Sequence, residues 1–249
     1  MLGLPHSITA CLFDLDGVLT RTAAQHAQAW KEMLDDFLRQ WSEQTGEPLK
    51  PFELPGDYDA SVDGKPRLDG VLSFLASRGI ELPLGSPDDP PDAQTAHGLG
   101  NRKNVLVLEL IRTRGVEVFE GSVRYVEKAR EHGLRCAVVS SSKNCREVLA
   151  AVGIEHLFEA VVDGVYAERE GLAGKPAPDT FLAGARLLQT EPPHAAVFED
   201  ALAGVEAGRR GGFGDVVGVD RTGQAEALKA AGADIVVRDL SELLDEDDR

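Results

Sequence analysis

The sequence predicts an α/β protein in which a doubly wound parallel sheet carries an inserted all-helical domain. Short apolar runs, each ending in a polar residue, alternate with segments of helical composition, as in a parallel sheet covered by helices. The stretch from about residue 22 to residue 118 has no such run and repeats apolar side chains at helical spacing. The expected strands are Ile8–Phe13, Cys136–Val139, Ala160–Val162, Ala195–Phe198, Val216–Val219 and Ile235–Val237.

The segments between the later strands supply the helices of the sheet domain. Helical composition predicts helices at Cys145–Val152, Asp179–Leu188 and Ala201–Arg210. Gly153 and Gly211 follow two of these segments, at the position where glycine commonly ends a helix.

The insert begins directly after the first strand, and three apolar stripes predict its helices. The stripes are Trp30-Leu34-Phe37-Leu38-Trp41, Val71–Leu75 and Val105–Ile111, and the proline-rich stretch Pro83–Pro91 is expected to be a loop. We therefore assign residues 21–118 to a helical cap domain, and residues 1–20 and 119–249 to the sheet domain. The acidic end, Asp245–Arg249, is expected to be a frayed tail.

The composition excludes several classes of partner. The 249-residue chain has 26 Lys and Arg against 42 Asp and Glu, and its formal charge of −16 argues against binding to nucleic-acid phosphates. Its three cysteines have no C-x-x-C spacing and are too few for a disulfide framework. No stretch is apolar over the roughly 20 residues of a membrane span, and no signal peptide is recognisable. We expect a cytoplasmic monomer that acts on a small molecule, with no nucleic-acid or membrane partner.

Polar side chains with chemical potential follow four of the expected strands. Asp14 and Asp16 stand at the end of the first strand, where one carboxylate can attack an electrophile while the other transfers a proton. The later motifs are Ser140-Ser141-Ser142-Lys143-Asn144, Gly174-Lys175-Pro176 and Glu199-Asp200. Each motif alone also fits a turn or a helix cap. Together they converge on one edge of one sheet.

These four motifs, in this order, resemble those of the haloacid dehalogenase superfamily. Within it the sequence is similar to the β-phosphoglucomutase-like and phosphatase subfamily with a helical cap, through residues 22–31, 140–144 and 174–181. The resemblance implies a Rossmann-like core, Mg²⁺ as the cofactor and a hexose phosphate as the substrate. Arg21 departs from the family pattern, in which an acid is usual at this position, and the insert is longer than the usual helical cap.

The resemblance also implies a role for each motif residue. Asp14 would form an aspartyl phosphate, Asp16 would act as acid and base, and Ser140 and Lys175 would hold the phosphoryl group. The implied Mg²⁺ ligands are Asp14, the backbone carbonyl of Asp16, Glu199 and Asp200. The candidates for substrate binding are His26, Arg102, Ser141, Ser142, Lys143 and Asn144.

Several activities remain compatible with these residues. A mutase converting β-glucose 1-phosphate to glucose 6-phosphate needs a second phosphate site, whereas a phosphatase gives the phosphoryl group to water. The main cationic candidates for the second site are Arg102 and Lys143, and Lys65 and Arg67 are weaker ones. A non-catalytic phosphosugar-binding module and phosphonate cleavage through a cap lysine (Lys31, Lys65 or Lys103) stay open. Carbon–halogen hydrolysis is disfavoured because it needs neither a metal cluster nor Asp16. A phospho-acceptor signalling module is disfavoured because its acceptor aspartate lies on a later strand.

Overall fold

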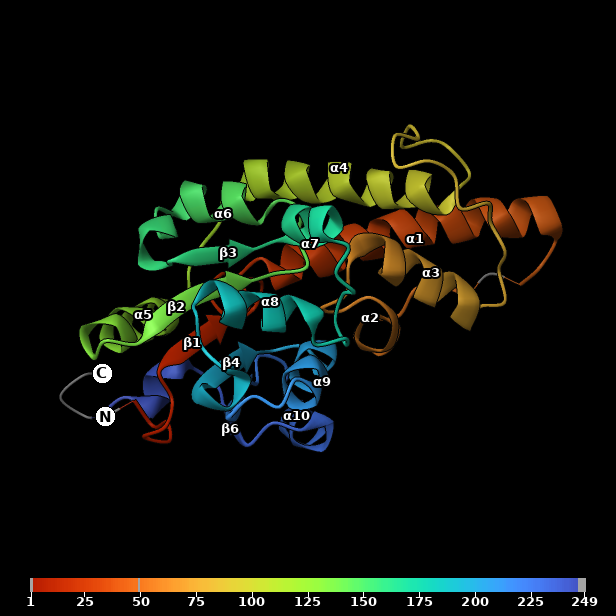
Figure 1. Cartoon of the computed structure of the whole chain (residues 1–249). Helices are drawn as coiled ribbons and strands as arrows, with labels where there is room; N and C mark the ends of the chain where they lie inside the picture. The colour runs from red at the N-terminus through yellow and green to blue at the C-terminus, as the bar shows by residue number, and fades with distance from the viewer. Residues whose placement is uncertain (1, 49, 246–249) are drawn as a thin grey trace. The chain divides into compact units, whose positions relative to one another are not determined.

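The chain divides into two compact units, each described here by itself (Figure 1). The computed structural model describes residues 2–48 and 50–245, so most of the expected acidic tail, residues 246–249, lies outside the described residues. The core unit comprises the chain up to Arg21, the short segment Gly64–Pro66 and the chain from Val116 onward. The cap unit comprises Thr22–Asp63 and Arg67–Gly115. The segment Gly64–Pro66 lies within the range assigned to the cap domain from sequence, but it packs as part of the core unit.

The core unit contains a six-stranded, all-parallel sheet, which confirms the predicted α/β class. The strand order is β3-β2-β1-β4-β5-β6, so the order along the chain reverses between β1 and β4. In open α/β sheets, ligands bind beyond the carboxyl ends of the strands at such a reversal. The strands are β1 (Ala10–Phe13), β2 (Arg135–Val139), β3 (Ala160–Val162), β4 (Ala195–Glu199), β5 (Asp215–Val219) and β6 (Ile235–Val237). Each overlaps a predicted run.

The helices of the core unit connect these strands. Those predicted after β2, β3 and β4 are present within a residue of their expected ends, whereas α5, α7 and α10 were not predicted. Helix α7 is short, and its start depends on the side chain of Asp163, which accepts a hydrogen bond from the Tyr166 amide at 2.7 Å. The helices are α5 (Glu120–Glu131), α6 (Cys145–Val152), α7 (Gly164–Glu170), α8 (Asp179–Leu187), α9 (Leu202–Arg210) and α10 (Ala225–Ala231).

Alternation along β1 distributes its side chains to the two faces of the sheet. Ala10 and Leu12 join an apolar cluster with residues of α8, α9 and α10. Phe13 points to the opposite face and stacks on Phe198 of β4, with ring centroids 4.4 Å apart, and Tyr125 of α5 packs against both rings. Because the next residues in these two strands are Asp14 and Glu199, this aromatic packing fixes the strand ends that carry the acids.

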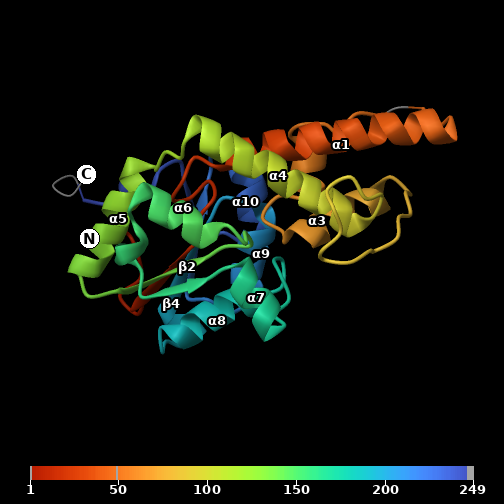
Figure 2. The same ribbon diagram turned by 90° about the horizontal axis from the view of Figure 1, so that it is seen from above.

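The cap unit is all-helical among its described residues. Its helices are α1 (Ala23–Thr45), α2 (Gly56–Ser61), α3 (Arg67–Ser77) and α4 (Ala96–Arg114), and α1 and α4 run side by side (Figures 1 and 2). The predicted stripe on α1 packs inward, with Trp30, Leu34 and Phe37 buried. Helix α4 begins nine residues before the predicted stripe because Thr95 caps it, accepting a hydrogen bond from the Gly98 amide at 3.0 Å.

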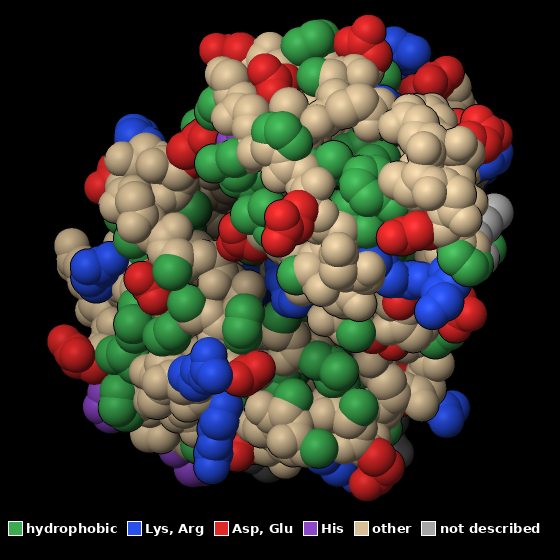
Figure 3. All heavy atoms as spheres, turned by 90° about the vertical axis from the view of Figure 1, so that its right-hand side faces the viewer, with side chains coloured by type: hydrophobic (Ala, Val, Ile, Leu, Met, Phe, Trp, Pro, Cys, Tyr) green, Lys and Arg blue, Asp and Glu red, His purple; other side chains and the backbone are tan. Residues whose placement is uncertain are grey.

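On the face shown in Figure 3, acidic and basic side chains are interspersed with uncharged and apolar ones. Among residues 2–48 and 50–245, no helix is both long and apolar enough to cross a membrane. The three cysteines are free thiols, and all are buried.

We expect the substitution Asp215→Asn to stabilise the protein above pH 6. Asp215 begins β5 and is 7% exposed; its burial, and secondarily the carboxylate of Asp234, raises its pKa from 3.8 to about 6. The folded state then binds the proton more tightly than the unfolded state, so stability decreases as pH rises from 3.8 to 6. Urea unfolding at pH 7.5 should show Asp215→Asn more stable by up to about 3 kcal/mol.

The same comparison at pH 4 should give nearly equal stabilities, because Asp215 is then protonated in the folded protein. Asp179→Asn, on the partly exposed start of α8, is the control and should change little at either pH. A less stable Asp215→Asn protein at pH 7.5 would contradict the prediction.

Candidate active site

Three carboxylates meet where β1 and β4 end. Asp14 follows β1, and its amide donates to the carbonyl of Phe198 at 2.9 Å, while Glu199 and Asp200 follow that same residue. One oxygen from each of the three carboxylates lies within 4.8 Å of the others, and all three residues are buried. Like charges in such a buried space repel strongly, so the cluster requires a neutralising cation.

Lys175 supplies a permanent part of that positive charge. Its Nζ donates to Asp14 Oδ1 at 2.5 Å, to Glu199 Oε1 at 2.5 Å and to the carbonyl of Val139 at 3.2 Å, and its side chain is fully buried. Three acceptors match the three hydrogens of an ammonium group. Burial alone would lower the pKa of Lys175, but the carboxylates of Asp14 and Glu199 outweigh it and raise the pKa. Lys175 therefore stays charged and joins the ends of β1, β2 and β4.

Two glycines make room for the acids. Gly17 has φ +89°, and a Cβ placed on it would lie 1.8 Å from Asp200 Oδ2. Gly204, in the first turn of α9, is equally close to Glu199: a Cβ placed on it would lie 1.8 Å from Glu199 Oε1. Glu199 Oε2 also accepts the Ala201 amide at 2.9 Å, so both of its oxygens have donors. Both glycines therefore leave space that the carboxylates occupy.

Asp16 lies on the turn that follows β1 and is more exposed than Asp14. The turn is closed by the Gly17 amide, which donates to the carbonyl of Thr20 at 2.8 Å. Ser140 follows β2 and is buried; its amide donates to the carbonyl of Val162, and its Oγ accepts the Ser142 amide at 3.1 Å. Asp14, Asp16 and Ser140 thus follow the carboxyl ends of neighbouring strands β1 and β2.

The other polar residues after β2 have separate partners within the core unit. Ser141 Oγ donates to the carbonyl of Gly64 at 2.8 Å, and Ser142 Oγ accepts the Asn144 amide at 3.1 Å. Lys143 Nζ lies 2.7 Å from Glu168 of α7. Asn144 stands at the start of α6, without a side-chain cap bond to that helix. Ser141, Ser142, Lys143 and Asn144 remain predicted substrate-binding residues.

In the cap unit, His26, a predicted substrate-binding residue, contacts the buried side chain of Lys103. The sequence does not predict this pairing. His26 Nδ1 lies 2.9 Å from Lys103 Nζ, and burial, followed by the Lys103 charge, lowers the pKa of His26 well below 6.5. Because an ammonium only donates, the neutral imidazole accepts at Nδ1 and carries its proton on Nε2. Lys103 is seven residues into α4, and nothing in its local sequence indicates that it is buried.

Arg102 forms contacts inside the cap unit. Its Nε donates to the carbonyl of Pro91 at 2.7 Å, and its Nη1 lies 3.3 Å from Asp36 Oδ2. These contacts fasten the proline-rich loop to α1 and α4. Arg102, a predicted phosphate-binding residue, thus already has a carboxylate partner for its charge. Lys31, one of the lysines considered for phosphonate cleavage, is paired with Asp35 at 2.8 Å.

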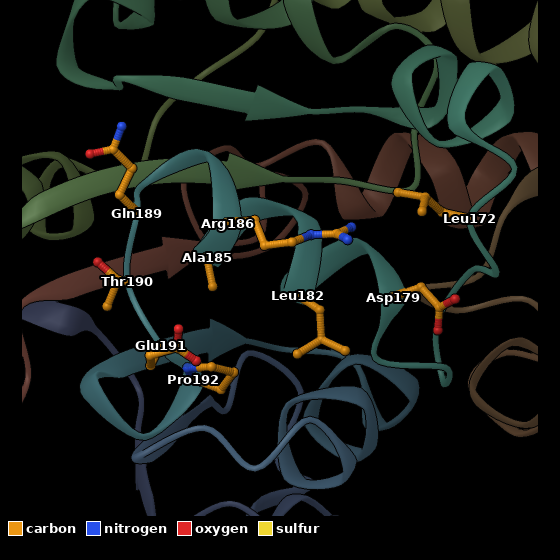
Figure 4. Close-up of a pocket in the computed structure, with 9 residues that line it drawn as sticks. All are labelled: Leu172, Asp179, Leu182, Ala185, Arg186, Gln189, Thr190, Glu191 and Pro192. Atoms are coloured by element: carbon orange, nitrogen blue, oxygen red, sulfur yellow. The ribbon is translucent and has the colours of Figure 1, made fainter.

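A surface groove elsewhere in the core unit does not coincide with these residues. It lies along α8, and Figure 4 shows Arg186 extending across it toward Leu172 and Asp179. The residues lining the groove include none of the three clustered acids or Lys175. The chemistry of the core unit is therefore assigned to the strand ends rather than to this groove.

Comparison with known proteins identifies the family. The family model described as haloacid dehalogenase-like hydrolase matches residues 8–212. The chain belongs to the haloacid dehalogenase-like hydrolases. It is 56% identical over 247 residues to a β-phosphoglucomutase of Mycobacterium bovis, covering 98% of this chain and 94% of that protein.

Two further similar proteins carry the names of a phosphatase and of a mutase. A fructose-1-phosphate phosphatase of Escherichia coli, YqaB, is 29% identical over 206 residues, covering 81% of this chain and 92% of that protein. The crystal structure of a β-phosphoglucomutase from Clostridium difficile superimposes with a TM-score of 0.73 at 25% identity, covering 96% of this chain and 94% of that one. The relatives thus include both mutases and phosphatases.

The donor set of this haloacid dehalogenase-like site fits a hard divalent cation. The clustered side-chain donors are all carboxylate oxygens, the ligand type that Mg²⁺ and Ca²⁺ prefer. Octahedral Mg²⁺ with ligands at about 2.1 Å places neighbouring and opposite oxygens about 3 to 4 Å apart, which the cluster spacing accommodates. The acids therefore form a candidate metal site.

We expect Gly17→Ala to lower activity on a small aryl phosphate on the order of 100-fold, because the new methyl group must displace Asp200 or the turn. Steady-state kinetics with urea unfolding would measure the effect. Gly153→Ala is a matched control: Gly153 also has positive φ (+74°), but no atom lies within 4 Å of the added carbon. Equal losses of activity in the two variants would show that backbone strain, not contact with Asp200, is responsible.

Proposed function

We propose that this chain is a Mg²⁺-dependent β-phosphoglucomutase, which converts β-glucose 1-phosphate to glucose 6-phosphate through an aspartyl phosphate on Asp14. The observation that carries the proposal is the 56% identity to the Mycobacterium bovis β-phosphoglucomutase over nearly the full length of both chains. The four motifs also lie within residues 8–212, which the family model matches.

Asp14 is the proposed nucleophile. Lys175 binds Asp14 Oδ1 and so fixes the plane of the carboxylate, while its charge favours approach of a phosphate dianion. As the Asp14 oxygen bonds to phosphorus, the bond from phosphorus to the sugar oxygen breaks. Asp16 gives that oxygen a proton and later removes one from the hydroxyl that accepts the phosphoryl group. The buried hydroxyl of Ser140 is proposed to donate to a phosphoryl oxygen.

The proposed Mg²⁺ ligands are Asp14, the backbone carbonyl of Asp16, and Asp200. Glu199 has the same charge, but its two oxygens accept from Lys175 and from the Ala201 amide. We therefore propose that Glu199 orients Lys175 and reaches the ion through water. When bound, the ion supplies charge neutralisation and polarises a phosphoryl oxygen.

Candidate substrate-binding residues are proposed in each unit. His26, whose Nδ1 accepts from Lys103, is the proposed cap residue for contact with the sugar. A remote phosphate would have to compete with Glu168 for Lys143 and with Asp36 for Arg102. Exchanging the partner of an exposed ion pair costs little free energy, and the pair of Lys143 with Glu168 is exposed.

The three free thiols are consistent with the proposed cytoplasmic location.

The second candidate is a sugar-phosphate phosphatase, favoured by the similarity to the fructose-1-phosphate phosphatase. It would use the same Asp14 chemistry and transfer the phosphoryl group to water. A non-catalytic binding module would not need Asp14 to be held by Lys175 within a cluster of buried carboxylates.

Product analysis distinguishes the two candidates. The chain is incubated with β-glucose 1-phosphate, Mg²⁺ and a trace of bisphosphorylated glucose, and glucose 6-phosphate and free phosphate are measured separately. We expect glucose 6-phosphate to exceed free phosphate at least tenfold. Predominant release of phosphate would favour the phosphatase, and no turnover would contradict both. Asp14→Asn should abolish either activity without unfolding the chain, while Asp179→Asn should retain it.

Metal dependence gives a separate prediction. Chelation with EDTA should abolish turnover, and added Mg²⁺ should restore it. Asp200→Asn should raise the Mg²⁺ concentration needed for half-maximal activity more than Glu199→Gln does, because of these two residues only Asp200 is proposed to bind the ion directly. Calorimetric titration of each variant with Mg²⁺ checks the ranking, and full activity in excess EDTA would overturn the proposed metal site.

A further inference from the structure

The loop that follows β5 lies at the same carboxyl edge as the acids but belongs to none of the recognised motifs. Asp220 organises it: Oδ1 accepts the amides of Thr222, Gly223 and Gln224 at 3.2, 2.6 and 2.8 Å. Three amides on one carboxylate oxygen give the loop a defined shape. That shape directs the side chains of Arg221 and Gln224 toward the two loops that carry the acids.

Arg221 binds the turn that follows β1. Its Nε donates to the carbonyl of Gly17 at 2.8 Å, and its Nη2 lies 3.4 Å from the carbonyl of Val18. The guanidinium stacks 3.5 Å from the ring centroid of Phe119, and its Nη1 donates to the carbonyl of Arg238 at 2.5 Å. The planar fork therefore holds the Asp16–Val18 turn against two other segments of the core unit.

Gln224, at the other end of the loop, binds the β4 end. Its Nε2 donates to the backbone carbonyl of Asp200 at 3.1 Å. One short loop thus contacts the backbone on both sides of the acidic cluster. The two sides also touch each other, because Gly17 lies directly against the carboxylate of Asp200. Movement of either loop would change the spacing of the acidic oxygens.

We propose that Arg221 and Gln224 are positioning residues, which hold the Asp16–Val18 turn and the Asp200 backbone in the arrangement that binds the divalent cation. The inference rests on the proposed function for the identity of the cation. Arg221 also places a positive charge near Asp200, which reduces repulsion among the acids when the cation is absent. Neither side chain is required to touch the substrate.

A matched arginine in the cap unit separates positioning from general stabilisation. Arg78 donates to the backbone carbonyls of Lys50 and Pro51, pairs with Asp57 and stacks on Phe74 at 5.1 Å. It is 17% exposed, against 15% for Arg221. Its contacts have the same types as those of Arg221, but all of its partners lie in the cap unit. Arg78→Gln is therefore the control for Arg221→Gln.

The experiment compares the wild type with Arg221→Gln, Arg221→Lys, Gln224→Leu and Arg78→Gln, all as full-length chains. Amide hydrogen exchange is measured without metal over residues 14–20 and over a reference peptide in β5. Calorimetry gives the dissociation constant for Mg²⁺ alone, and urea unfolding gives the stability. We expect Arg221→Gln to accelerate exchange at residues 14–20 at least tenfold, with the reference peptide unchanged, and to weaken Mg²⁺ binding at least tenfold.

Arg221→Lys, which keeps the charge but loses the fork, should give an intermediate effect. Gln224→Leu should weaken Mg²⁺ binding with little change in stability. Arg78→Gln should lower the stability without changing exchange at residues 14–20 or Mg²⁺ binding. Wild-type exchange at residues 14–20 in Arg221→Gln, or acceleration matched by the reference peptide, would overturn the inference. If the wild type failed to turn over β-glucose 1-phosphate, the proposed function would fail, while the exchange measurement would still decide the positioning role.

Discussion

The structure of the site depends on one buried ammonium group. The sheet brings two strand ends together at its topological reversal, and each ends in a carboxylate that has left bulk water. Without a cation, the cost of burying Asp14 beside Glu199 would oppose the pairing of β1 with β4. Lys175 offsets that cost by contacting both carboxylates and the carbonyl of Val139. The same contact that permits folding also orients the proposed nucleophile.

Aromatic packing and two glycines shape the surroundings of the acidic cluster. Beneath it, the stacked rings of Phe13 and Phe198 hold the two strands in register. Around it, Gly17 and Gly204 let the backbone approach the carboxylates more closely than any side chain would allow. The charges are therefore preorganised before any ligand binds, which is the condition for electrostatic stabilisation of a transition state.

Local sequence predicted the strands and the order of the motifs, because a buried parallel strand needs a continuous apolar run and its carboxyl end is where polar groups can face a ligand. It could not predict which partner a long side chain would choose. Lys143 pairs with Glu168, and Arg102 binds Pro91 and Asp36, and neither pairing is indicated by the local sequence. Lys103 has no local signal of burial, since the imidazole and indole that cover it come from another helix.

The strand order has a consequence for synthesis of the chain. β1 is central, and its two neighbours are β2 and β4, which begin 125 and 185 residues later than its first residue, Ala10. At about 5–20 residues per second, β4 emerges from a ribosome roughly 10–40 s after β1. During that interval Ala10–Phe13 has no complete sheet to join, whereas the intervening helical residues can already pack together. The insert can thus fold before the sheet domain is complete, and the surroundings of Asp14, the proposed nucleophile, form only after Glu199 and Asp200 have been made.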